Sequence, residues 1–197
     1  MTATTTQRHD DPRVERTRAA VVEAAADLLT TEGPGAVTHA GVAAAANVSR
    51  TTVYNHWPTR EDLLRATIES VGKLPPDVDS LTGDLRTDLG QLFEQLVADL
   101  VDEQRAPMIA NMMERALHDS AVVTVRNEFL AAFERAFRTV VEAGVAAGQL
   151  RSDIDVARSM AGLAGSFLFA RFMTPAGLDR EFADAVLDDF VTVNAPR

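Results

Sequence analysis

Four consecutive hydrogen-bonding residues follow the alanine-rich stretch that ends at Val48: Ser49, Arg50, Thr51 and Thr52. Arginine can bind phosphate through paired N–H donors or fork onto the edge of a guanine. Threonine can donate to phosphate or base, and its methyl group can contact thymine. A helix that begins at this serine would offer these groups to the major groove of a duplex. The four residues therefore predict contact with double-stranded DNA.

Two short helices must position these side chains. Capping and breaking residues predict one helix over residues 38–46 and another over 49–56, which Trp57-Pro58 ends. Asn47 can adopt the left-handed backbone that a tight turn between them requires. The small side chains Ala43–Ala45 allow the two helices to approach closely. Two helices joined by so short a turn form a helix-turn-helix.

Helical patterns on either side complete this unit. Pro12 opens a helix that Gly33-Pro34-Gly35 ends. Thr59 caps a further helix that extends to Gly72, and Asp62 stands where a capping-box acid belongs. The run 74–77, Leu-Pro-Pro-Asp, predicts a linker after it.

Beyond this linker the sequence favours helices only, over residues 81–103, 107–117, 121–147, 155–173 and 181–193. We therefore predict an all-α fold of about nine helices. The predicted organisation is a flexible arm at 1–11, a DNA-binding domain at 12–73 and a larger helical domain at 79–197.

The charge of the chain is unevenly distributed. The net charge is −10, yet residues 1–60 contain six arginines and six acidic residues, so the net acidity lies beyond Arg60. An acidic body is repelled by phosphate, and this repulsion would orient the neutral N-terminal region toward DNA.

Composition also limits the compartment and the chemistry. The chain contains no cysteine, which excludes disulfides, thiolate zinc sites and cysteine catalysis. The first ten residues are polar, unlike a signal peptide, and the apolar stretch 160–170 is too short to span a bilayer. We expect a soluble cytoplasmic protein without membrane partners.

The run from Thr38 to Leu64 resembles the DNA-binding domain of the TetR/AcrR family of repressors. The resemblance rests on Thr38, Val42-Ala43, Ala46-Asn47-Val48-Ser49 and the stretch Thr52-Val53-Tyr54-Asn55-His56-Trp57-Pro58-Thr59-Arg60-Glu61-Asp62-Leu63-Leu64. Trp57 stands where the family usually has phenylalanine, and Asn47 stands where it usually has glycine.

The resemblance implies a dimeric transcriptional repressor. Tyr54, His56 and Arg60 would then contact phosphate, as would His39 at the start of the preceding helix. The full predicted DNA-binding set is Thr38, His39, Ser49, Arg50, Thr51, Thr52, Tyr54, Asn55, His56 and Arg60. The family also implies a palindromic operator, a small-molecule effector and a homodimer through the last two helices, here residues 161–173 and 182–191. The same face could instead pack inside one chain.

Apolar side chains of the larger domain indicate the chemistry of the effector. Methionine and phenylalanine recur on adaptable binding surfaces, which favours a small apolar or aromatic molecule. The candidate pocket residues are Phe93, Met108, Met112, Phe129, Phe133 and Phe167. The same side chains could form an ordinary core, and Phe129, Phe133 and Phe137 are spaced as a core stripe.

Other classes of protein have weaker support. Glu114 and His118 have the spacing of a metal pair, but no third ligand accompanies them, so we expect neither a metal nor a cofactor. The chain has no Gly-x-Ser-x-Gly elbow, phosphate-cradling glycine loop or clustered histidines, and we predict that it is not an enzyme. Scattered catalytic residues would keep that alternative open. A helical adaptor that binds only protein would leave Arg50, Thr51 and Thr52 without a purpose.

Overall fold

The computed structural model describes residues 12–71 and 81–196. Within these residues the chain forms nine helices and no strand, which confirms the all-α prediction. The helices belong to two compact units, with the division between residues 71 and 72. The predicted arm at 1–11 and the linker at 74–77 lie outside the described residues. No helix in the described ranges is long and apolar enough to cross a membrane.

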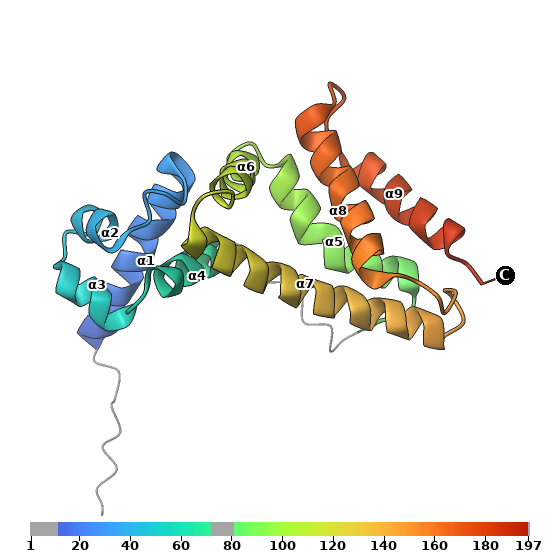
Figure 1. Ribbon diagram of the computed structural model, residues 1–197, viewed down its shortest axis with the longest axis horizontal. Coiled ribbons are helices and arrows are strands. Elements are labelled where there is room, and N and C mark those ends of the chain that lie inside the picture. Colours follow the sequence, from blue (N-terminus) through green and yellow to red (C-terminus); the bar gives the residue numbers. More distant parts are fainter. Residues whose placement is uncertain (1–11, 72–80, 197) are drawn as a thin grey trace, which may run out of the picture. The chain divides into compact units, whose positions relative to one another are not determined.

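Unit 1 contains the four helices that the N-terminal sequence predicts: α1 (Pro12–Glu32), α2 (His39–Ala45), α3 (Arg50–His56) and α4 (Arg60–Val71). Helix α1 packs against α4 and α2, and α2 packs against α3 (Figure 1). The apolar core of unit 1 includes Val21, Ala25, Leu29, Val42, Ala43, Val53, Trp57, Leu63 and Leu64. Of the three alanines predicted at the α2–α3 crossing only Ala43 is buried, because Ala44 and Ala45 lie on the outer side of α2.

Local capping interactions set the ends of the short helices. The Thr38 Oγ1 atom accepts from the Gly41 amide at 3.0 Å and begins α2. Asn47 adopts a φ of 52°, the left-handed turn that the sequence predicts. Thr59 and Asp62 form the predicted capping box, in which each side chain accepts from the other residue's amide, at 3.1 and 3.2 Å. The turn geometry that positions α3 is therefore encoded locally.

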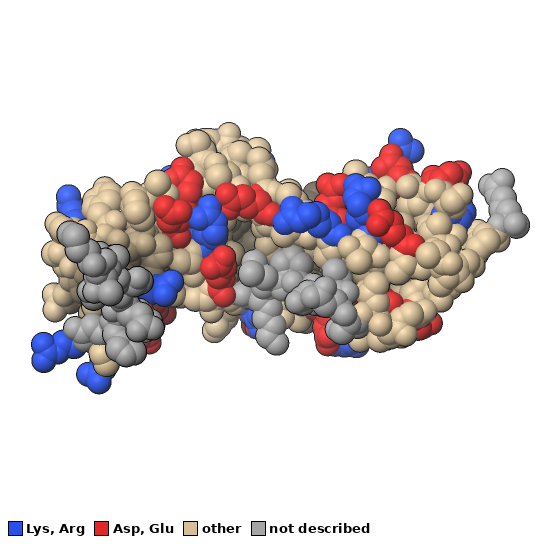
Figure 2. Space-filling model, turned by 90° about the horizontal axis from the view of Figure 1, so that it is seen from below, with Lys and Arg blue, Asp and Glu red and all other residues tan. Residues whose placement is uncertain are grey.

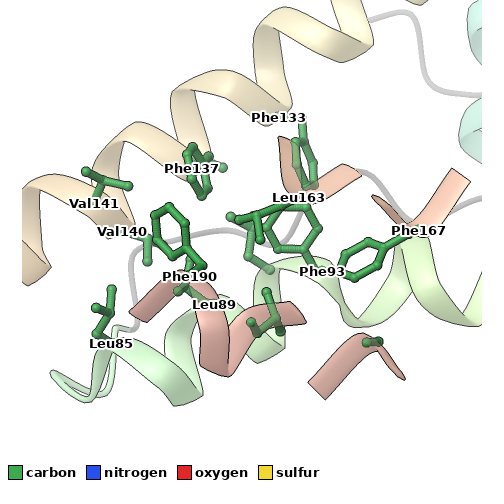
Figure 3. Close-up of a cluster of buried hydrophobic side chains, with 14 of the residues drawn as sticks. Leu85, Leu89, Phe93, Phe133, Phe137, Val140, Val141, Leu163, Phe167 and Phe190 are labelled. Atoms are coloured by element: carbon green, nitrogen blue, oxygen red, sulfur yellow. The ribbon is translucent and has the colours of Figure 1, made fainter. Parts of the chain in front are cut away.

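Unit 2 consists of α5 (Leu85–Val101), α6 (Arg105–Arg115), α7 (Ser120–Ala146), α8 (Val156–Met173) and α9 (Arg180–Val193). Helices α5, α7, α8 and α9 pack on one another, and α6 contacts α5 and α7 (Figure 1). Five phenylalanines lie in the core of this bundle: Phe93, Phe133, Phe137, Phe167 and Phe190 (Figure 3). The ring of Phe93 meets Phe133, Phe167 and Phe137 edge to face, at centroid distances of 5.1, 5.5 and 6.0 Å. Such pairs contribute about 0.5–1.5 kcal/mol each beyond the burial of their surface.

Two expectations for unit 2 were wrong in detail. Helix α5 begins at Leu85 rather than near residue 81, because the buried Asp88 carboxylate accepts from the Thr82 amide and hydroxyl at 2.8 and 2.7 Å and holds the preceding residues outside the helix. Phe129 is 39% exposed rather than part of the core. Phe93 packs on the next two turns of α7, at Phe133 and Phe137, and leaves Phe129 at the core's edge.

Candidate nucleic-acid interface

The outer face of α3 carries four exposed side chains: Arg50, Thr51, Tyr54 and Asn55. Within the described residues none of them makes a side-chain hydrogen bond to another group. Counted from Arg50, these side chains are at positions i, i+1, i+4 and i+5, which lie on one side of a helix. Val53, on the other side, is fully buried. The helix therefore presents a guanidinium, two hydroxyls and a carboxamide together, which are the donor and acceptor types that read phosphates and base edges.

The predicted contacts Ser49 and Thr52 lie at the start of α3. The Ser49 Oγ atom accepts from the Thr52 amide at 3.0 Å and lies 2.8 Å from the Thr52 hydroxyl. One hydroxyl proton is used between them, so the pair first serves to cap the helix. Its contact with DNA stays a prediction.

His39, a predicted DNA contact, is largely buried, and its contact with DNA stays a prediction. Its side chain is only 8% exposed. The imidazole stacks on the Tyr54 ring, with centroids 3.9 Å apart and planes 8° from parallel, and its Nε2 atom donates to the Trp57 carbonyl at 2.7 Å. The histidine thus lies behind Tyr54 because both its ring face and its nitrogen are engaged by α3.

Arg60, which the sequence predicts to contact phosphate, makes hydrogen bonds within unit 1. Its Nε atom donates to the Val37 carbonyl at 2.8 Å and Nη2 donates to the Pro34 carbonyl at 2.7 Å. These carbonyls lie in the loop before α2 and have no helical partner, so a cation that satisfies them stabilises the loop. Arg60 therefore links the start of α4 to the α1–α2 loop.

The two remaining predicted residues lie at the edges of the interface. Thr38 caps α2, and its hydroxyl oxygen is engaged by Gly41. His56 is half-buried at the end of α3, with its ring tilted against the indole of Trp57 at a centroid distance of 5.5 Å.

Gly41 is a positioning residue that the sequence analysis missed. A Cβ atom at this position would lie 2.7 Å from the Ala36 carbonyl oxygen, closer than real contacts allow. Glycine therefore lets α2 lie directly against the loop before it. A glycine inside a seven-residue helix is unfavourable by propensity, and that conflict was the available signal.

Hydrogen bonds at the start of α4 perturb the acidity of Asp62. The hydroxyl of Thr59, and then Arg65, donate to its carboxylate and hold the pKa of Asp62 below its ordinary value. The carboxylate is thus charged at neutral pH and stabilises the positive end of the α4 dipole.

The surface of unit 2 carries charges of both signs. Figure 2 shows basic and acidic side chains next to one another over the visible face of this unit. Arg86, for example, pairs with Asp184 at 2.8 Å and with Asp188. Mixed charge of this kind gives phosphate no broad basic surface to bind on the visible face.

The six candidate pocket residues do not form one cavity lining. Phe93, Phe133 and Phe167 fill the core ring against ring (Figure 3), Phe129 is exposed, and Met108 and Met112 of α6 are half-buried. A hollow of about 280 Å³ between α5 and α9 includes Phe93, but its rim carries Arg86, Glu94, Arg180 and Asp184. The rim is thus more polar than an apolar effector requires.

The geometry of α2 and α3 is that of a DNA-binding helix-turn-helix followed by an all-α body, and comparisons with known proteins agree. Residues 21–67 match the family described as bacterial regulatory proteins, tetR family, and residues 75–190 match the tetracyclin repressor-like C-terminal domain. The second match spans more than half of the chain. The protein belongs to the TetR family of bacterial transcriptional regulators.

Curated relatives and solved structures are consistent with this membership. The chain is 26% identical to the uncharacterized HTH-type transcriptional regulator YdeS of Bacillus subtilis, over 93% of each chain. It is 25% identical to the HTH-type regulator Rv1556 of Mycobacterium tuberculosis, over 86% of this chain and 83% of that one. The fold is similar to that of the TetR family regulator SCO0332, with a TM-score of 0.66, 24% identity and coverage of 92% and 100%. It is also similar to Salmonella enterica GusR, with a TM-score of 0.68, 15% identity and coverage of 95% and 99%.

Proposed function

We propose that this regulator is a ligand-responsive repressor that binds a palindromic operator as a homodimer. A small apolar or aromatic molecule that binds unit 2 would release it. A repressor of this kind acts in the cytoplasm, where the bacterial chromosome lies, and the proposal includes no catalytic step. The single observation that carries it is the outer face of α3, where Arg50, Thr51, Tyr54 and Asn55 are exposed together.

The supporting helices give this face a fixed direction. Ser49 and Thr52 hold the start of α3, while Trp57 at its end is 4% exposed and accepts a hydrogen bond from His39. A side chain on such a helix is oriented before DNA arrives, so less conformational entropy is lost on binding. Exposed donors on a rigid helix are what major-groove recognition requires.

Dimerisation is supported by apolar side chains that unit 2 leaves exposed on α8 and α9. Phe169 of α8 is 59% exposed and Val193 of α9 is 77% exposed. Gly162 and Gly165 lie on the same side of α8, and a Cβ atom at either would meet nothing within 4 Å. Small residues that face outward do not serve packing within the chain, but they would let a helix of a second copy approach closely. We propose that α8 and α9 pair with those of the second copy.

The homodimer would couple the two ends of the molecule. Two recognition helices must reach successive major grooves, about 34–36 Å apart on the duplex. An effector that binds more tightly to a conformation with another separation must weaken DNA binding by linkage. The half-buried Met108 and Met112 and the exposed Phe129 remain our candidates for the effector contact.

Footprinting on the DNA beside the protein's own gene tests the proposal. We expect a protected region with two-fold symmetry, lost when a suitable apolar or aromatic compound is added. The double variant Arg50→Ala, Thr51→Ala should lose the footprint, whereas Arg138→Ala, on the exposed surface of α7, should keep it. Protection without symmetry would contradict the dimeric operator, and protection unaffected by any compound in a broad apolar panel would contradict release by such an effector.

A further inference from the structure

The imidazole of His39 stacks on the protein-facing side of the Tyr54 ring. Direct contact with DNA does not explain why a largely buried histidine stands at this position. We propose that His39 is a positioning residue, which holds the Tyr54 ring in its binding orientation before a duplex arrives. The inference rests on the proposed function, since the value of that orientation lies in DNA binding. In this proposal a buried histidine of α2 fixes the orientation of a side chain on α3.

The contact between the two rings restricts Tyr54. The side chain of Tyr54 is 50% exposed, so one face of its ring is open to solvent while the other lies on the imidazole. The centroids are 3.9 Å apart and the planes differ by 8°, which is parallel stacking. An exposed tyrosine without such a support would exchange between side-chain rotamers and would lose that freedom on binding.

His39 can serve as a support because it is itself fixed. It is the first residue of α2 and is 8% exposed. A carbonyl oxygen can only accept, so the short contact with Trp57 means that Nε2 carries the hydrogen. Trp57 is buried, and its amide donates to the Val53 carbonyl at 2.9 Å in the last turn of α3. The imidazole is therefore held at its edge by the end of the same helix that carries Tyr54.

This arrangement joins two functions in one side chain. The hydrogen bond fixes the end of α3 relative to α2, and the stacked face fixes the tyrosine one turn earlier. A leucine at position 39 would fill similar space but would offer neither a flat face nor a donor. A phenylalanine would keep the flat face alone, so substitutions can separate the two contributions.

The composition of the chain allows a direct test, because Tyr54 is its only tyrosine and Trp57 its only tryptophan. Fluorotyrosine incorporated into the full-length protein gives a single ¹⁹F resonance that reports the surroundings of Tyr54. In His39→Leu we expect this resonance to move toward the position of a free, exposed tyrosine. We also expect the operator dissociation constant to rise about 2- to 10-fold at fixed salt, in line with the loss of an aromatic pair.

Three further variants separate positioning from a general structural effect. His39→Phe should retain the wild-type resonance and bind the operator more tightly than His39→Leu. In a Tyr54→Leu background, His39→Leu should have less effect on affinity than it has in the wild type. His118→Ala, which removes an exposed histidine of unit 2, should leave the resonance and the affinity unchanged. Circular dichroism and Trp57 fluorescence identify folded variants, and His39→Phe against wild type carries the comparison if His39→Leu does not fold.

The outcomes distinguish failure of this inference from failure of the proposed function. If the wild-type protein binds no duplex from its own locus, the proposed repressor function fails and this role with it. If the wild type binds and His39→Leu leaves the Tyr54 resonance in place, His39 does not position the ring. An equal loss of affinity in the wild-type and Tyr54→Leu backgrounds would likewise overturn the role, as would a loss with His39→Phe as large as that with His39→Leu.

Discussion

At the scale of single residues, the recognition unit divides its polar side chains into two groups. Arg50, Thr51 and Asn55 face outward on α3 and have no hydrogen-bond partner within the described residues. His39 and Arg60 donate to backbone carbonyls of the same unit. A donor engaged inside the protein is oriented but occupied, whereas an exposed one is available to DNA. We therefore expect the outward group to set sequence preference and the inner group to set overall affinity.

Two substitutions on α3 should separate contact with a base from contact with the DNA backbone. Arg50→Ala removes a group that can fork onto guanine and should weaken binding by about 1–3 kcal/mol at one base pair, with little effect on operators already altered there. Tyr54→Phe keeps the ring on His39 but loses the hydroxyl, and should cost about 0.5–1.5 kcal/mol for every operator tested. Titrations against single-base operator variants at constant salt measure both. A uniform loss with Arg50→Ala would show that it contacts backbone alone.

At the scale of elements, acidic and hydroxyl caps define where helices begin. Thr59 and Asp62 cap α4, and Asp84 caps α5 through the Thr87 amide at 2.9 Å. In each case the threonine hydroxyl also donates to the carboxylate and lowers the pKa of the aspartate below its ordinary 3.8. These interactions join residues that are three positions apart, so the starts of such helices can be predicted from the sequence.

The lowered pKa of Asp62 makes the start of α4 sensitive to acid. A carboxyl group whose pKa is lower in the folded state stabilises that state above its unfolded pKa, and the stabilisation is lost as the pH falls through the folded pKa. Thr59→Val should raise the pKa of Asp62 toward 3.8 and reduce the difference in stability between neutral and strongly acidic pH. Carboxyl NMR titration measures the pKa, and thermal unfolding across pH measures the stability. Thr87→Val is the matched control, because it should raise the pKa of Asp84 and leave that of Asp62 in place.

At the scale of the whole molecule, the function proposed for this regulator depends on two copies. Helix α8 is apolar on most sides, a composition typical of a helix surrounded by other helices. Its buried side packs into unit 2 through Leu163, Phe167 and Ala170, while Phe169 and Met173 remain exposed. A second chain is the partner that would cover them and set two α3 helices at a defined separation.

A charge on this exposed face should dissociate the dimer. Phe169→Asp is expected to yield a folded monomer and to abolish high-affinity operator binding. The reason is that a monomer binds the operator through one α3 helix instead of two. Sedimentation velocity gives the oligomeric state, and circular dichroism verifies the fold. Leu117→Asp is the matched control: Leu117 is 76% exposed but follows α6, so its substitution should change neither mass nor binding. A Phe169→Asp protein that remains dimeric would place the interface elsewhere.

The amino-acid sequence by itself determined the helical elements, the turn before α3 and the membership of a DNA-binding family. The signals for these are local: glycine and proline breaks, caps three residues from their targets, and apolar periodicity. The start of α5 was not predicted correctly from these local signals. One reason is that the Leu85 amide donates to the side-chain oxygen of Gln149 at 2.8 Å, and Gln149 is far from Leu85 in the sequence.

The tertiary structure alone decided which polar side chains of the recognition unit are available. His39 and Arg60 look like surface residues in the sequence, yet each reaches a carbonyl on an element distant in the chain, at Trp57 and at Val37. Likewise only the packing of Phe93 on Phe133 separates a core ring from the exposed Phe129 one turn away. The physical reason is that burial and hydrogen bonding between distant segments depend on how helices are placed in space, which no local pattern of residues encodes.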